Sequence, residues 1–105
     1  HAAAAVDRSH QTGHRLHHAH ALASLATATL LLGDRDTAQA RATAAHMIHK
    51  DAGARVGEAE TLVVLARCAT DPERAMTYLH DAQNLLAHAH AATDHVDALI
   101  RTLRT

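Results

Sequence analysis

The sequence has few of the residues that build aromatic cores, tight turns and covalent cross-links. Its 105 residues include no tryptophan or phenylalanine, one tyrosine, one proline, one cysteine and four glycines. Strands favour aromatic and β-branched residues, whereas the alanine that makes up about a quarter of this chain favours helices. These absences argue against a β-sandwich and predict an all-α fold with a core of small and aliphatic side chains.

Other classes of protein are disfavoured on similar grounds. The net charge is −1 with no basic stripe or aromatic platform, so we expect no direct nucleic-acid binding by this segment. No apolar run approaches the ~20 residues of a membrane span, and there is no signal-peptide pattern. The lone Cys68 cannot form an internal disulfide, which favours the cytoplasm. Because the chain lacks an initiating Met and stops in a helical pattern, we expect a fragment of a longer protein.

Turn residues and apolar periodicity predict the helices. A helix ending near residue 10 and a break at Gln11, Thr12 and Gly13 are expected first. The following helices are predicted at about 14–32, 37–50, 54–69, 72–91 and from 93 onward. One face of the predicted helix at 14–32 carries Leu16, Leu22, Leu25, Ala26 and Thr29. One face of the predicted helix at 54–69 carries Val56, Ala59, Leu62, Val63 and Ala66.

The stretch from Leu30 to Ala45 predicts the elbow of an antiparallel helical hairpin. Gly33 is a helix stop that tolerates the left-handed conformation, and Asp34 can cap the next helix. Ala38, Ala42 and Ala45 then share one helical face. Small residues at this spacing let a second helix approach closely.

The chain repeats itself at a shift of 40 residues. Gly13, Arg15, Leu22 and Leu25 fall on Gly53, Arg55, Leu62 and Leu65. Across the elbow the second copy is three residues shorter, and beyond it Ala38 and Ala45 correspond to Ala75 and Ala82. The repeat predicts one domain, residues 1–105. Its parts are a half repeat at 1–12, full repeats at 13–52 and 53–92, and the start of another at 93–105.

The segment 22–45 resembles a tetratricopeptide (TPR) repeat. Leu25 and Ala26 match the Leu and small residue of the family's first helix, Ala38 and Ala45 match the small residues of its second, and the Leu-Gly-Asp turn at 32–34 is similar. The period of 40 exceeds the usual thirty-four, and Thr29 and Ala42 stand where the family has large residues. The resemblance implies an α-solenoid of helical hairpins.

The phrase GARVGEAETLVVLA at 53–66 resembles the TPR regions of actinobacterial transcriptional regulators related to the Streptomyces antibiotic regulatory proteins. That resemblance implies a protein–protein or peptide interaction module, a sensory or scaffold segment of a bacterial regulator, rather than an enzyme. It also implies that the first helices of the hairpins line a concave binding surface. The partner-binding residues expected there are Arg15, Leu22, Thr29, Arg55, Glu58, Thr61 and Arg67.

Arg15 and Arg55 occupy the same repeat position, so their guanidinium groups can clamp carboxylates of a peptide or bond the linkers. The one tyrosine, Tyr78, is expected to be partly in the core, with a groove contact as the alternative. Cys68 is expected to be inert packing on a helix. Glu58 and Glu60 diverge on a helix and make no acid–base pair.

The sequence contains twelve histidines, and His14, His17 and His18 form the best cluster. Their spacing of three and four residues can chelate Zn²⁺, Ni²⁺ or Cu²⁺, but we expect a solvated helix surface and no cofactor. Because imidazole titrates near ~6.5, protonation of the cluster at 14–20 predicts lower thermal stability at pH 5.5 than at pH 8. The alternatives to a groove binder are a metal-binding domain and a structural segment that self-associates through open solenoid ends.

Overall fold

The computed structural model describes the backbone of residues 2–104 and the side chains of residues 13–104. Within that part the chain is all-α, as predicted, with no strand. Its helices are α1 (Ala2–Leu31), α2 (Arg35–Ala52), α3 (Arg55–Cys68), α4 (Pro72–His88) and α5 (Asp94–Arg104). They form an elongated body of 55 × 31 × 17 Å.

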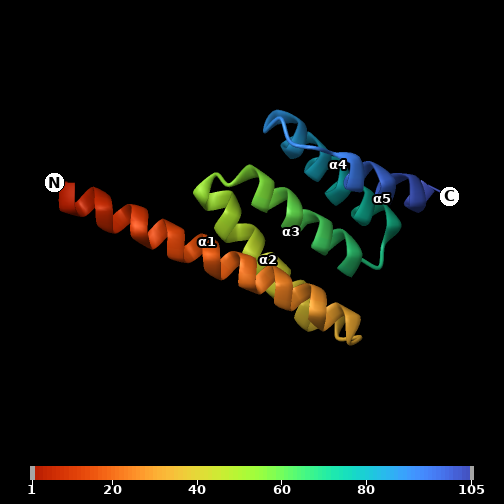
Figure 1. Ribbon diagram of the computed structural model, residues 1–105. Helices are drawn as coiled ribbons and strands as arrows, with labels where there is room; N and C mark the ends of the chain where they lie inside the picture. Colours follow the sequence, from red (N-terminus) through yellow and green to blue (C-terminus); the bar gives the residue numbers. More distant parts are fainter. Residues whose placement is uncertain (1, 105) are drawn as a thin grey trace.

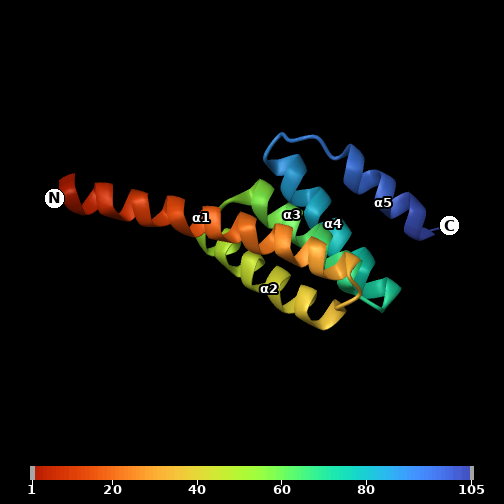
Figure 2. The same cartoon turned by 60° about the horizontal axis from the view of Figure 1, so that its bottom comes forward.

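Each helix packs against the next one in the chain (Figures 1 and 2). The most extensive contacts are between α1 and α2, followed by α3 with α4 and α2 with α3. Helix α1 also touches α3, so α3 lies between three neighbours and most of its residues are buried. The first part of α1 extends beyond the other helices in both views.

The elbow predicted around Gly33 is confirmed. Gly33 has a φ of 92°, in the left-handed region where an L side chain is strained. The Asp34 side chain accepts a hydrogen bond from the Thr37 N–H at 3.2 Å and caps α2. Helix α2 then ends at Gly53, whose φ is 70° and whose N–H turns back to the carbonyls of His49 and Lys50.

The turn between α3 and α4 begins the fourth helix with a side-chain cap and a proline. The Asp71 side chain caps α4 by accepting a hydrogen bond from the Glu73 N–H at 3.0 Å. Pro72 is the first residue of α4, a position where its missing N–H leaves no helical hydrogen bond unmade.

The break predicted at Gln11–Gly13 is wrong, because α1 is one continuous helix of 30 residues. A glycine inside a helix costs only about 1 kcal/mol, and Gly13 is not followed by a cap or a proline that would end the helix. The half repeat expected at residues 1–12 is therefore not a separate helix. The side chains of these twelve residues lie outside the described part.

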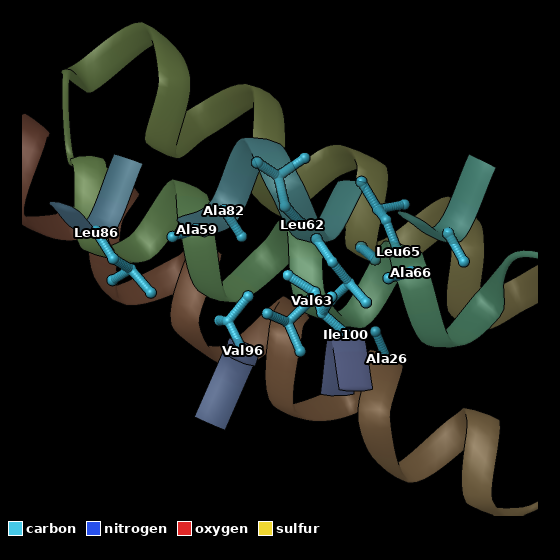
Figure 3. Close-up of a cluster of buried hydrophobic side chains, with 13 residues drawn as sticks. Ala26, Ala59, Leu62, Val63, Leu65, Ala66, Ala82, Leu86, Val96 and Ile100 are labelled. Atoms are coloured by element: carbon cyan, nitrogen blue, oxygen red, sulfur yellow. The ribbon is translucent and has the colours of Figure 1, made fainter. Parts of the chain in front are cut away.

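Small residues form the contact between α1 and α2, as the elbow predicted. Ala38, Ala42 and Ala45 are fully buried, and their counterparts Ala75 and Ala82 are buried in α4. Leu62 is also interior, as expected for the core of the hairpins. The main cluster of buried apolar residues draws on all five helices (Figure 3).

Two aliphatic side chains that were predicted to face the core are instead half exposed. Leu25 on α1 is 49% exposed and Val56 in the first turn of α3 is 43% exposed. Helix α1 is covered mainly by α2 and touches α3 only slightly. The buried stripe of α1 is consequently narrow and centres on Ala19, Ala26 and Thr29.

Candidate functional site

A groove runs between α2 and α4 with α3 at its base. Its volume is about 480 Å³. It is lined by His46 and Lys50 of α2, Glu58 and Leu62 of α3, and Tyr78, Asp81, Asn84, Leu85 and His88 of α4. We call this the α2–α4 groove. Apolar side chains form its base and ionisable or amide side chains form its walls, an arrangement typical of ligand-binding clefts.

One wall of the α2–α4 groove brings an imidazole of α2 close to a carboxylate of α3, a contact that is an ion pair only when His46 is protonated. His46 Nε2 lies 3.4 Å from Glu58 Oε2, and both side chains are about one-fifth exposed. Glu58 stands in the first turn of α3, where a carboxylate interacts favourably with the helix dipole. The opposite wall carries Tyr78, which is half buried, packs against the core cluster and also lines the groove.

Near His46 and Glu58 lies a buried histidine, His49, that was not predicted from the sequence. His49 is 1% exposed, and neither of its ring nitrogens has a hydrogen-bond partner. Its ring meets the exposed His20 of α1 edge-on, with centroids 5.2 Å apart and planes at 74°. On the other side it lies against Gly57 of α3, where any Cβ would collide with the imidazole.

The surroundings of His49 favour its neutral form. Burial lowers the pKa of His49 below the ordinary value of 6.5, and the nearby His20 and His46 lower it further. Glu60 and Glu58 oppose the shift but do not reverse it. The sequence did hold a signal for this placement, because His49 continues the buried stripe Ala38, Ala42, Ala45 at helical spacing.

A second groove lies between the ends of α3 and α5 and the start of α4. Its volume is about 310 Å³. The lining is mostly apolar, with Arg67 as its one charged side chain: Ala66, Arg67, Ala69, Thr70, Pro72, Ala75, Leu79, Leu99, Thr102 and Leu103. This is the α3–α5 groove.

The predicted partner-binding residues do not gather on one surface. Glu58 lines the α2–α4 groove and Arg67 the α3–α5 groove. Leu22 is half buried on α1, while Arg15 and Arg55 are exposed and line neither of these grooves. Of the predicted set, only Glu58 and Arg67 line these two grooves, and they line different ones.

Two residues of that set lie inside the protein. Thr61 is 0% exposed, and its hydroxyl donates to the carbonyl oxygens of Gly57 and Glu58 one turn earlier. Thr29 is also buried, donates to the Leu25 carbonyl and accepts a 2.6 Å hydrogen bond from Arg41 Nη1. The expectation that Thr29 and Thr61 contact a partner is corrected, because packing between helices covers them.

The histidine cluster that was weighed as a metal site lies on the exposed surface of α1. His14, His17 and His18 are exposed on α1, and among residues 13–104 no three His, Cys, Asp or Glu side chains come together as a metal site would require. One helical face brings histidines into line, but a metal site needs further ligands from another element.

Cys68 is buried packing, as expected. Burial raises the pKa of the Cys68 thiol, and the opposing influence of Arg35 is weaker. Arg35 Nη1 instead donates to the Cys68 carbonyl oxygen at 3.3 Å, which ties the start of α2 to the end of α3. The thiol is thus protonated and shielded, a poor nucleophile.

No helix in the described part of the chain is both long enough and apolar enough to cross a membrane. Comparison with known proteins finds no significant match to a protein family, a curated protein or a solved structure.

Proposed function

We propose that this chain is a non-catalytic interaction module that binds a protein or peptide segment in the α2–α4 groove. The observation that carries the proposal is the composition of this groove, in which the apolar Leu62 and Leu85 lie among polar and ionisable side chains. Apolar contact supplies affinity in such a cleft, and the surrounding polar groups orient the bound segment.

The finer architecture belongs to the same proposal. We propose a TPR-like solenoid of antiparallel hairpins with a period of about 40 residues. Its support is the matched sequence of residues 13–52 and 53–92, together with the packing of each helix on its neighbour in the chain. The resemblance of residues 53–66 supports a sensory or scaffold role in an actinobacterial regulator, and the lone Cys68 favours the cytoplasm.

Selection from a displayed peptide library tests the groove. Asp81 and Asn84 are exposed residues of its wall, so Asp81→Arg/Asn84→Arg reverses its charge without touching the core. Asp51→Arg/Ala40→Arg adds the same charge at exposed positions outside both grooves. Peptides selected on the wild-type chain should lose at least tenfold in affinity for the first variant and keep it for the second.

The proposal fails if the library yields no binder, or if both double variants bind the selected peptides as the wild type does. Circular dichroism melts establish that each variant is folded before binding is compared. The design separates loss of the groove from loss of the fold, because both variants carry the same change in net charge.

Self-association is a second candidate, favoured by one specific observation. Leu31 and Leu32, at the end of α1, are 84% and 87% exposed, and adjacent exposed leucines are typical of a contact surface. Light scattering across concentration should then show a dimer that Leu31→Ser/Leu32→Ser abolishes. A monomer at all concentrations would eliminate this function and leave the groove proposal intact.

A further inference from the structure

His49 sits where three helices meet, in a place where neither nitrogen of its ring has a hydrogen-bond partner. It belongs to α2, contacts His20 of α1 and lies directly against Gly57 of α3. A neutral imidazole carries one N–H donor and one acceptor, and both ring nitrogens are unpartnered. The contact surface between these helices therefore contains a titratable group held only by packing.

Protonation makes this position much less favourable. An imidazolium has two N–H donors and a positive charge, and burying a charge without a partner is costly. Two of the groups that face the ring, His20 from α1 and His46 from α2, carry the same charge when protonated. Glu58 and Glu60 from α3 are the opposing charges, and Glu58 is already near His46.

The backbone of His49 connects the ring to the turn between α2 and α3. Its carbonyl oxygen accepts the Ala54 N–H at 2.9 Å, and Gly53 has the φ of 70° that lets the chain reverse. The same end of α2 carries His46, whose imidazole lies 3.4 Å from Glu58 in the wall of the α2–α4 groove, so a movement of this helix end reaches both the turn and the wall.

We propose that His49 is a proton-operated latch: neutral, it holds the end of α2 against α1 and α3, and on protonation in mild acid it releases that end and opens the groove wall. The latch is a property of the helix junction and does not depend on whether the groove binds a peptide. Opening at lower pH agrees in direction with the lowered pKa of His49 in the folded chain.

The sign of the pH dependence follows from that direction. The open state takes up the proton near the ordinary pKa of 6.5 and the closed state only at lower pH, so acid favours opening. Opening is unaffected well above pH 6.5 and increases as the pH falls below it. Between pH 7.5 and 5.5 the open population gains up to about tenfold.

Hydrogen exchange followed by mass spectrometry at pH 7.5 and 5.5 tests the latch, with rates corrected for the intrinsic effect of pH. Protection in residues 46–60 should fall up to about tenfold at pH 5.5 in the wild type, while α4 stays protected. His49→Leu replaces the imidazole with an apolar side chain and should lose this response. His17→Gln/His18→Gln removes exposed histidines of α1 and should keep it.

Three results would overturn the proposal. Protection in residues 46–60 can be equal at the two pH values, the acid response can persist in His49→Leu, or His17→Gln/His18→Gln can abolish it, which would place the sensor on the surface of α1. If His49→Leu does not fold, an NMR titration of the wild-type imidazoles replaces it. An ordinary titration of the His49 ring near 6.5, with the chain still closed, would equally refute the latch.

Discussion

Gly57→Ala should destabilise this protein, although alanine is the better helix former. A Cβ at position 57 would lie closer than 3.0 Å to Nδ1, Cε1 and Cγ of the His49 ring, and real Cβ contacts do not occur at that distance. The obstacle is a rigid imidazole that is itself 1% exposed and enclosed by three helices. Either the ring or the start of α3 must move.

Two opposing free energies decide the magnitude. Overpacking a well-packed interior costs about 1–3 kcal/mol. Replacing a helical glycine with alanine gains up to about 1 kcal/mol in an interior turn, and less at position 57, the third residue of α3. The free energy of unfolding should therefore fall by roughly 1–2 kcal/mol.

Urea denaturation measures this loss, and the chain contains a matched control. Gly13 also lies within a helix, but a Cβ there would meet nothing within 4 Å. Gly13→Ala should leave the protein unchanged or raise its stability by up to about 1 kcal/mol. In a His49→Ala background the space is open, so adding Gly57→Ala there should cost nothing or stabilise.

The reasoning is refuted if Gly57→Ala is as stable as the wild type. It is refuted equally if the substitution costs the same with and without the His49 ring, because the double-mutant cycle then shows no coupling between the two positions.

Three other predictions follow from the same structure. Leu62→Ala should cost about 2–5 kcal/mol in urea denaturation because Leu62 is interior, and a loss under about half a kcal/mol would contradict the packing of α3. Gly53→Ala should cost about 1–2 kcal/mol, since its φ of 70° strains an L side chain; no measurable loss would contradict the turn. The melting temperature should be lower at pH 5.5 than at pH 8, because the unfolded chain protonates His49 more readily than the folded one; equal melting temperatures would remove His49 as the cause.

Much of the fold could be predicted because its determinants are local. Glycine at positions 33 and 53 and the Asp71-Pro72 pair mark helix ends through backbone chemistry, and the structure uses each of them in that way. Gly13 is also a glycine, but its backbone is not left-handed, and α1 continues through it. Gly33 and Gly53 end their helices in the left-handed conformation, and the residue type alone does not distinguish them from Gly13.

The site could not be predicted in the same way because it is assembled from distant segments. The α2–α4 groove takes its lining from three helices between residues 46 and 88, and a helical period does not say which neighbour covers which face. The resemblance to TPR proteins implied that Thr61 lies on a binding surface, whereas α3 has neighbours on several sides that bury it. The sequence predicted acid sensitivity from the histidines at 14–20. The structure points to a different residue, His49, as the group to test for it.

The pairing of His49 with Gly57 is costly to stability at both positions, which is an argument for a role beyond packing. The hydroxyls of the buried Thr29 and Thr61 donate hydrogen bonds to helix carbonyl oxygens, whereas the ring of His49 has no such partner. An unsatisfied buried donor costs about 1–3 kcal/mol, and the glycine that makes room for the ring adds the weakness of glycine in a helix. An apolar side chain at position 49 would leave no unsatisfied donor at this junction. Residues that break local rules in this way are expected where a protein uses a change of state, and the change that an imidazole offers is protonation.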